Sequence, residues 1–285
     1  MANMRDIRRR IKSVKSTQQI TKAMKMVAAA KLRKSQAALD AMRPYADKNQ
    51  EILGNLLGGH AEHNHPLLAE RPQVKKVCYV LLAGERGLCG GYNSSICRLA
   101  EETLRKETRE TVLVTCGRRG RDMLTRAGFP ILQSFTNLGD NPSFAQSVAL
   151  YEYLVDLFLQ GEVDEIYFVY QEFISAIQQK PTVRRIFPVS VDESHQRERL
   201  VDYLFEPNEQ VILDTLLPQY LECIIYQVML EAKAGEHGAT MTAMSAATDN
   251  AAAMLERLTL SLNRARQAAI TTEISEIVSG AAALQ

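Results

Sequence analysis

The sequence contains no tryptophan, no apolar run long enough to cross a membrane and no C-x-x-C pair among its five cysteines. A membrane-spanning helix needs about 20 mostly apolar residues, so none is expected. A secretory signal is excluded because the basic first residues lack an apolar h-region. The odd number of cysteines, most of them in or beside apolar runs, predicts reduced and mostly buried thiols of a cytosolic protein rather than a metal or redox set. Helical periodicity begins near the first residue, so we expect a mature chain without a transit peptide.

Signatures of catalysis are also absent. The residue spacing gives no Ser-His-Asp, H-E-x-x-H or paired-carboxylate arrangement. Residues Gly84 to Gly91 follow a predicted strand, which is where doubly wound folds bind nucleotides. The stretch lacks the G-x-G-x-x-G spacing, there is no G-K-[ST], and no carboxylate ends the next strand at Thr115-Cys116-Gly117. We interpret it as a tight turn and expect no catalytic residue, metal or cofactor. A nucleotide-dependent enzyme is the alternative, and binding of ATP or NAD would decide it.

Two further patterns have a functional and a plainer interpretation. His60, His63 and His65, with Glu62, could ligate a metal, but no other Cys or acid lies at a firm spacing, so a loop is favoured. Residues 117–120, Gly-Arg-Arg-Gly, match the G-x-x-G loop that clamps nucleic-acid backbone. We interpret them as a strand-to-helix turn.

What the sequence does contain is a long helical seam at each end. Residues recur at alternating intervals of three and four, and the average of about 3.5 places a narrow stripe on one side of a helix. A second row, Ile20, Met24, Val27 and Lys31, lies beside the first seam. We therefore predict an antiparallel coiled coil between the two ends, weakened by Ala, Thr, Ser, Gln and Lys in the seam. The amino-terminal seam is Ile7, Ile11, Val14, Gln18, Thr21, Lys25, Ala28, Leu32, Ser35, Leu39 and Met42, and the carboxy-terminal seam is Met241, Met244, Thr248, Ala251, Leu255, Leu258, Leu262, Ala265, Ala269 and Thr272.

Charge is distributed unevenly along the chain. Residues 1–48 hold 13 Lys or Arg against 3 Asp, a net charge of +10, whereas the whole chain has +1. From residue 208 onward, nine acids face four bases. This asymmetry predicts two ends that attract each other, or a basic arm that binds an acidic partner. Nucleic-acid binding, whose affinity would fall steeply with salt, is the alternative. It is disfavoured because the first forty residues contain no aromatic side chain.

The middle of the chain changes period. Short β-rich runs at 74–83, 111–115 and 166–170 alternate with helical patterns at about 92–107, 118–127 and 143–160. This alternation is typical of a parallel sheet covered by helices. Extended segments at 181–191 and 203–205 precede the last helix, which is expected to begin near Pro207.

Several stretches resemble the gamma subunit of F-type ATP synthases. The amino-terminal helix matches at residues 20–31, Ile-Thr-Lys-Ala-Met-Lys-Met-Val-Ala-Ala-Ala-Lys, and the first turn of the middle domain at residues 87–91, Gly-Leu-Cys-Gly-Gly. The resemblance covers essentially the whole chain without a large insertion. The carboxy-terminal helix matches at Glu236, Ala239, Met241, Ala243, Met244, Ala247, Thr248, Asp249 and Asn250, then at 266–268, 270–271 and 276–281.

The resemblance implies an α/β fold class, with a long antiparallel coiled coil of the N- and C-terminal helices plus a Rossmann-like α/β middle domain that has no nucleotide site. The expected division is 1–57 for the amino-terminal coiled-coil helix, 58–73 for a linker, 74–206 for the Rossmann-like domain and 207–285 for the carboxy-terminal coiled-coil helix. It also implies a non-catalytic rotor shaft that couples proton or sodium flow to ATP synthesis or hydrolysis at the beta-subunit sites. The expected partners are three alpha and three beta subunits, an epsilon-type subunit and the c-subunit ring, with no nucleic acid. Membrane contact is expected through the c ring only, with a peripheral location on the cytoplasmic face of the bacterial cell membrane.

The resemblance also assigns rotor–stator contacts. Arg266, Gln267 and Thr271 match positions where the family contacts a beta-subunit loop, with packing between the two helices as the alternative. Lys22 and Lys25 are expected to face acidic beta-subunit loops, and Met24 to make soft contacts. The chain departs from the family at Thr240, where the family usually has arginine. Gly235 and Gly238 are expected to mark a flexible or closely packed point of the last helix. A regulatory cysteine pair like that of the chloroplast subunit is not expected, because residues 191–210 contain no cysteine.

Overall fold

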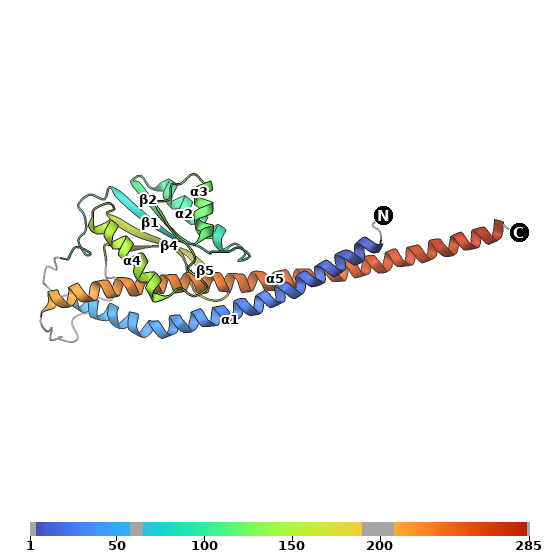
Figure 1. The fold of residues 1–285 in the computed structure, drawn as a ribbon, viewed down its shortest axis with the longest axis horizontal. Coiled ribbons are helices and arrows are strands. Elements are labelled where there is room, and N and C mark those ends of the chain that lie inside the picture. The colour runs from blue at the N-terminus through green and yellow to red at the C-terminus, as the bar shows by residue number, and fades with distance from the viewer. Residues whose placement is uncertain (1–3, 58–64, 190–207, 284–285) are drawn as a thin grey trace. The chain divides into compact units, whose positions relative to one another are not determined.

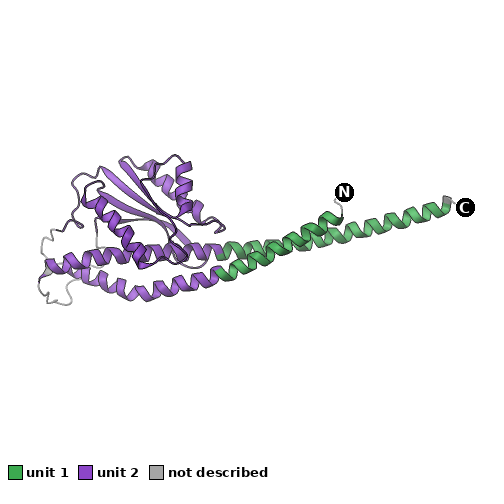
Figure 2. Ribbon diagram, viewed as in Figure 1, with its two compact units in different colours: residues 1–27, 241–285 green, residues 28–240 purple. Residues whose placement is uncertain are grey.

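The computed structural model describes residues 4–57, 65–189 and 208–283 (Figure 1). The chain divides into two compact units, one of residues 1–27 and 241–285 and the other of residues 28–240 (Figure 2). Two long helices, α1 (Met4–Leu57) and α5 (Glu209–Ala283), each contribute residues to both units. Proline lacks a backbone N–H and usually interrupts a helix. Nevertheless α1 continues through Pro44 and α5 through Pro218, so neither proline ends its helix.

The unit of residues 28–240 is built around a five-stranded sheet in the order β3-β2-β1-β4-β5. Strand β1 (Lys76–Leu82) pairs in parallel with β2 (Glu110–Cys116) and β4 (Glu165–Phe173), and β2 pairs in parallel with β3 (Gln133–Phe135). Strand β5 (Gln179–Phe187) forms an antiparallel edge beside β4. Central β1 is buried along almost its whole length, as expected of a parallel strand covered on both faces. The predicted α/β class is confirmed, whereas the antiparallel direction of β5 was not part of the prediction.

Helices cover both faces of this sheet. On one face, α2 (Tyr92–Lys106) and α3 (Arg118–Arg126) contribute Ile96, Ala100 and Leu124 to a core with strand β1. On the other face, α4 (Phe144–Leu159) and the first part of α5 pack with α1 through a second core. Helix α4 begins with a capping box between Ser143 and Gln146, which satisfies backbone N–H groups at its amino end. These helices lie within two residues of the patterns that the sequence predicted. The second core includes Leu53, Leu150, Leu154, Phe158, Leu213, Leu217, Leu221 and Ile225.

The other unit is a two-stranded coiled coil. The side chains of Thr248 and Thr21 are joined by a 2.8 Å hydrogen bond, and Nζ of Lys25 donates to Oγ of Ser245 at 2.9 Å. Residue numbers that rise on one helix therefore fall on the other, and the two helices run antiparallel (Figure 1). Met244 is almost fully buried in this seam. The antiparallel pairing predicted from the two seams is confirmed.

The seam differs from its prediction in three respects. Lys25, a predicted seam residue, is exposed, although its Nζ bonds to Ser245. Ala269 and Thr272 are exposed, because the seam on α5 ends at half-buried Ala265 and every residue from 266 to 282 is exposed. In the second row, Ile20 and Val27 are also more than half exposed. The contact between two slim helices is thus one row wide, since a seam buries only what its partner helix can cover.

Candidate functional site

The glycine-rich turn after β1 is held by Asn93 of α2. The backbone N–H of Gly84 donates to Oδ1 of Asn93 at 2.8 Å, and Nδ2 of Asn93 donates to the carbonyl of Arg86 at 3.1 Å. Leu88 adopts the left-handed conformation (φ 66°) with its side chain exposed. This geometry is that of a self-contained tight turn, which agrees with the interpretation preferred from the sequence.

Carboxylates of the chain itself occupy the position where doubly wound folds bind phosphate. The carboxylate of Glu85 accepts from the backbone N–H of Arg118, at the amino end of α3, and from that of Leu138, at 3.3 and 3.4 Å. The carboxylate of Glu236, from α5, lies 2.9 Å from where a Cβ on Gly84 would be. Phosphate would have to displace or approach these negative groups, so the strand ends are unsuited to a nucleotide.

The second glycine turn has a packing explanation. Gly117 has φ 100°, and a Cβ there would lie 2.1 Å from the carbonyl oxygen of Ala83. A Cβ on Gly120 would lie 2.8 Å from that of Ala83. Both glycines are therefore required for the close approach of α3 to β1, and the G-x-x-G pattern is accounted for by a strand-to-helix turn.

A cleft of about 340 Å³ opens beside these turns. Its charged lining consists of three acids and three bases, so it attracts neither anions nor cations strongly. Lys233 is buried and pairs with Glu236 at 2.8 Å. The lining residues are Glu85, Arg86, Arg118, Asn137, Gly139, Asp140, Lys233 and Glu236.

The candidate metal ligands are not assembled into a site within the described residues. His60 and His63 lie outside the residues that the structure describes. Nδ1 of His65 accepts from the backbone N–H of Leu67 at 3.1 Å, and Nε2 lies 3.8 Å from Asp214. In the described part of the chain, no group of three or more His, Cys, Asp or Glu could hold a metal ion. His65 therefore has a local role in ordering its loop.

All five cysteines are unpaired and buried. Burial raises the pKa of the Cys78, Cys97 and Cys116 thiols to about 12. They are protonated at neutral pH and shielded from solvent, so they act as small apolar side chains rather than nucleophiles.

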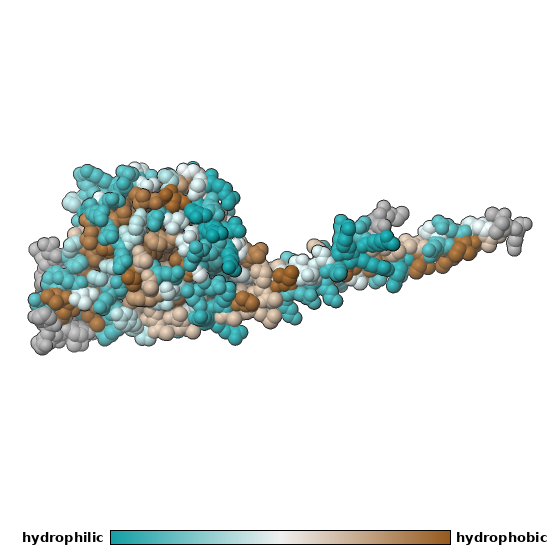
Figure 3. Space-filling model, viewed as in Figure 1, coloured by the Kyte–Doolittle hydropathy of each residue, from teal (hydrophilic) through white to brown (hydrophobic). Residues whose placement is uncertain are grey.

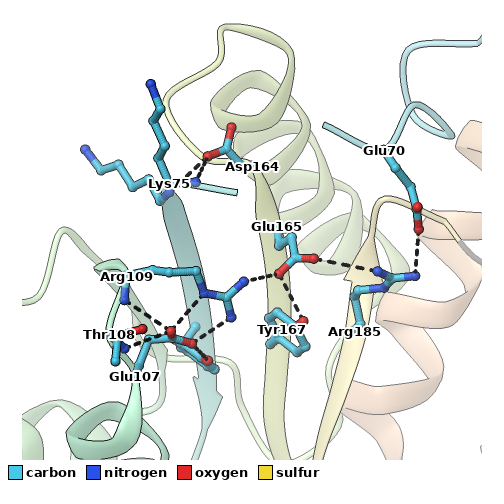
Figure 4. Close-up of polar contacts among 11 residues, drawn as sticks. Glu70, Lys75, Glu107, Thr108, Arg109, Asp164, Glu165, Tyr167 and Arg185 are labelled. Carbon is cyan, nitrogen blue, oxygen red and sulfur yellow. Dashed lines mark hydrogen bonds and ion pairs between the residues drawn. The ribbon is translucent and has the colours of Figure 1, made fainter. Parts of the chain in front are cut away.

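A network of ion pairs lies at the other edge of the sheet, where the parallel strands β2 and β4 begin (Figure 4). Arg109, which precedes β2, contacts Glu107 at 2.7 Å and Glu165 of β4 at 2.8 Å. Glu165 also lies 3.6 Å from Arg185 of β5, and Tyr79 of β1 donates to Glu107 at 2.8 Å. Hydrogen bonds from the Arg109 side chain lower the pKa of Glu107 to about 2. The sequence analysis did not find this network, because its members are scattered over residues 79–185.

The predicted coupling residues of α1 have different surroundings. Lys22 is exposed and Met24 is half-buried. Lys25 is exposed but bonded through Nζ to Ser245 of α5. Of these three, Lys25 thus has a role in joining the two helices of the coil, and Lys22 presents its charge to solvent.

The predicted coupling residues of α5 lie on a helix without a partner among the described residues. Arg266, Gln267 and Thr271 are all exposed, and the Thr271 hydroxyl bonds only to the carbonyl of Gln267 one turn earlier, at 3.0 Å. Within residues 4–57 and 208–283, packing between the two helices, the alternative for these positions, does not occur there. Thr240, at the usual arginine position, likewise bonds within its helix, to the carbonyl of Glu236 at 2.7 Å.

The same stretch of α5 carries exposed apolar side chains that the sequence analysis missed. Ile270, Ile274, Ile277 and Val278 are between 48% and 71% exposed, and Figure 3 shows a hydrophobic strip near this end of the helix. Their intervals of four, three and one place them on one helix face, which is the signal that could have identified them. A single helix with an uncovered apolar face is marginal in water and is typical of a segment that another chain covers.

The fold and these surfaces define a class of protein. It combines a coiled coil of the two chain ends with a doubly wound domain in which the chain's own carboxylates lie at the usual phosphate position.

The comparisons with known proteins agree with this class. A family model described as ATP synthase matches residues 3–284. The ATP synthase gamma chains of Desulfitobacterium hafniense and Moorella thermoacetica are 51% and 52% identical over 285 residues, covering all of both chains. The chain belongs to the ATP synthase gamma-chain family.

Solved structures have the same fold. A chain of the Tetrahymena thermophila mitochondrial ATP synthase, from a central stalk and c-ring structure, aligns with a TM-score of 0.60 and 24% identity. The alignment covers 80% of this chain and 99% of that one. A chain of the Euglena gracilis enzyme aligns with a TM-score of 0.72 and 18% identity, covering 99% and 94%. None of the described helices has both the length and the apolar character that a membrane crossing requires.

Proposed function

We propose that this chain is the central rotor shaft of an F-type ATP synthase. It couples proton or sodium flow across the membrane to ATP synthesis or hydrolysis at the beta-subunit sites by rotating inside the ring of alpha and beta subunits. The observation that carries this proposal is the carboxy-terminal helix, exposed from residue 266 to 282, with its apolar face uncovered beyond the end of the coil. A surface that rotates inside a ring of subunits needs many weak contacts, because strong binding in one orientation would stop the rotation.

The proposed partners are three alpha and three beta subunits, an epsilon-type subunit and the c ring. The similar structures support this set, since they are those of a central stalk with a c ring and of an assembly of OSCP, F1 and c ring. In this proposal membrane contact is made through the c ring only, and the chain is peripheral on the cytoplasmic face of the bacterial membrane. The division at residues 57/58, 73/74 and 206/207 is part of the same proposal.

The proposed coupling residues form two groups. Arg266, Gln267 and Thr271 contact a beta-subunit loop in one rotary state, and their exposure leaves them available for it. Lys22, Lys25 and Met24 contribute weaker contacts around the coil. Exposed ion pairs contribute only about 0.2–1 kcal/mol each, so torque is a sum over many of them.

The test is a pull-down of the tagged chain from the membranes of its own cells. The recovered complex is assayed for ATP hydrolysis, then stripped of this chain and assayed again, with the chain added back as the control. We expect recovery with alpha and beta subunits in excess and hydrolysis that depends on the chain. Recovery of the chain alone or with nucleic acid would contradict the proposal.

A further inference from the structure

The loop between β3 and α4, residues 137–142, reaches the long helices in the unit of residues 28–240. Asn137 and Gly139 both adopt left-handed conformations, with φ 63° and 72°. Two such bends within three residues reverse the chain sharply, and Asn and Gly are the residues that tolerate them best. The side chains of Asp140 and Asn141 are thereby turned toward α1, and the backbone carbonyl of Asp140 toward α5.

Asp140 and Asn141 contact both long helices. The carboxylate of Asp140 pairs with Nζ of Lys31 on α1 at 2.9 Å. The backbone carbonyl of Asp140 lies 2.8 Å from Nε2 of His237 on α5. A 3.1 Å hydrogen bond joins the side chains of Asn141 and Ser35, also on α1. One short loop of the α/β part therefore binds two helices that lie about 200 residues apart in the sequence.

Two of these partners are buried. Ser35 is fully buried and His237 is 6% exposed. Burial lowers the pKa of His237, so its ring is neutral at pH 7, and a neutral ring with its proton on Nε2 donates to the Asp140 carbonyl. Buried polar groups that lose their partners carry the full cost of desolvation, so this arrangement resists displacement.

The apolar contacts between the helices and the sheet do not resist turning in the same way. Leu53 of α1 and Leu213, Leu217 and Leu221 of α5 belong to the core shared with the sheet. Burial of apolar area is non-directional and tolerates small rotations of one element against another. Hydrogen bonds weaken steeply as their angles change, so the loop supplies the directional part of the attachment.

We propose that residues 137–142 form a clasp, in which Asp140 and Asn141 hold the α/β domain to α1 and α5 against twisting under load. This inference rests on the proposed rotor function, because it is torque on the two helices that the clasp would pass to the α/β domain. Lys31, Ser35 and His237 are its positioning residues on the helices.

The experiment uses the assembled membrane complex in inside-out vesicles. It compares Lys31→Glu, Asp140→Lys and the double variant that exchanges the two charges. Arg43→Glu is the matched control, because Arg43 is also a cation on α1 but its charge acts on Asp40 of the same helix and Glu231 of α5, not on the loop. ATP hydrolysis and ATP-driven ion uptake are measured on samples matched for subunit content. The readout is ion uptake per ATP hydrolysed, taken on vesicles freed of detached catalytic subunits, because such subunits would hydrolyse ATP without moving ions.

We expect each single charge reversal to lower uptake per ATP by about threefold, the scale of a partly exposed ion pair, and the exchanged pair to restore it. Asp140→Asn removes the charge that pairs with Lys31 without enlarging the side chain, and it is the second variant if Asp140→Lys does not assemble, with a smaller loss in the same direction. Single variants that behave like Arg43→Glu, or an exchanged pair no better than the singles, would overturn the clasp. Unaltered complex that hydrolyses ATP without ion uptake would overturn the proposed function, and the clasp with it.

Discussion

At the scale of single residues, Gly117 is explained by close packing rather than by a binding function. Gly117 approaches the Ala83 carbonyl so closely that a methyl group would overlap it, and its φ of 100° is unfavourable for any L-residue. We predict that Gly117→Ala lowers the free energy of unfolding by at least about 1–3 kcal/mol. Urea denaturation of the purified chain measures this. Gly91→Ala is the control, because a Cβ at Gly91 meets nothing within 4 Å. Equal stability of the two variants would contradict the explanation of the G-x-x-G turn.

Lys22 tests how widely torque is distributed. Its side chain is exposed, and an exposed ion pair is worth so little that Lys22→Ala should change the ATP turnover of the assembled complex by much less than about tenfold. The same tolerance is expected of Lys25→Ala, which loses the bond to Ser245. Arg266→Ala, at a preferred coupling position, is expected to be more severe. A loss beyond about tenfold from either lysine would show that a few contacts dominate.

Glu107 gives the fold a pH dependence. Its pKa is lowered to about 2 in the folded chain by the hydrogen bonds from Arg109, against about 4.3 when unfolded. A carboxyl with a depressed folded pKa contributes stability that is present above pH 4.3 and is lost as the pH falls toward 2. The free energies of unfolding of the wild-type chain and Glu107→Gln in urea should therefore approach each other as the pH falls from 5 to 3 and meet near pH 2. A constant difference over this range would contradict the role of the pair.

At the scale of elements, the part of α5 beyond the coil, residues 266–282, has an apolar face that we expect a partner chain to cover. Ile277 is 71% exposed, so Ile277→Asp should change the stability of the isolated chain by no more than about 0.5 kcal/mol. In the assembled complex, where the apolar face is covered, the same change should weaken association by about tenfold or more. Titration of the chain into alpha–beta complexes, with ATP hydrolysis as the signal, measures this. Glu273→Gln is the matched control, and equal behaviour of both variants would argue against a covering surface.

The sequence predicted the elements well because their evidence is periodic. The seams from Ile7 to Ala28 and from Met241 to Ala265 repeat every 3.5 residues on average. The strands of the sheet appear as short β-rich runs that alternate with helical patterns. The seam ends at Ala265 because α1 covers α5 only up to that residue. The spacing of apolar residues on α5 does not show where its partner helix begins. Gly235 and Gly238 could be read two ways. The structure shows close packing against Tyr92 and the Ala176 carbonyl.

The site was less predictable for a related reason. Glu85 and Glu236 occupy a phosphate position through contacts between distant parts of the sequence. Glu85 accepts from backbone N–H groups 33 and 53 positions away, and Glu236 lies against Gly84, about 150 positions before it. The lack of nucleotide motifs led to the expectation of a tight turn, but it did not reveal these carboxylates. The contacts of the Asp140 loop could not be predicted for the same reason, since neither Asp140 nor Lys31 is unusual in its local sequence.

At the scale of the whole molecule, the chain should have different dynamics alone and in its complex. The amides of residues 266–282 lie in a helix whose side chains are all exposed, and short isolated helices open readily in water. We predict rapid hydrogen exchange there in the isolated chain and strong protection in the assembled complex. The amides of buried strand β1 are the internal control, since they should exchange slowly in both. Protection that does not increase on assembly would contradict enclosure of this helix by a sleeve.

The buried cysteine thiols of this chain make it convenient to label at one chosen position. Because all five thiols are buried and protonated, a maleimide dye or a biotin linker should ignore them while the chain is folded. One cysteine introduced at an exposed position such as Lys22 or Glu273 would then be the only handle, without any native cysteine having to be removed. A fluorophore or bead could thus be placed on either helix of an otherwise unmodified chain, and its turning observed directly.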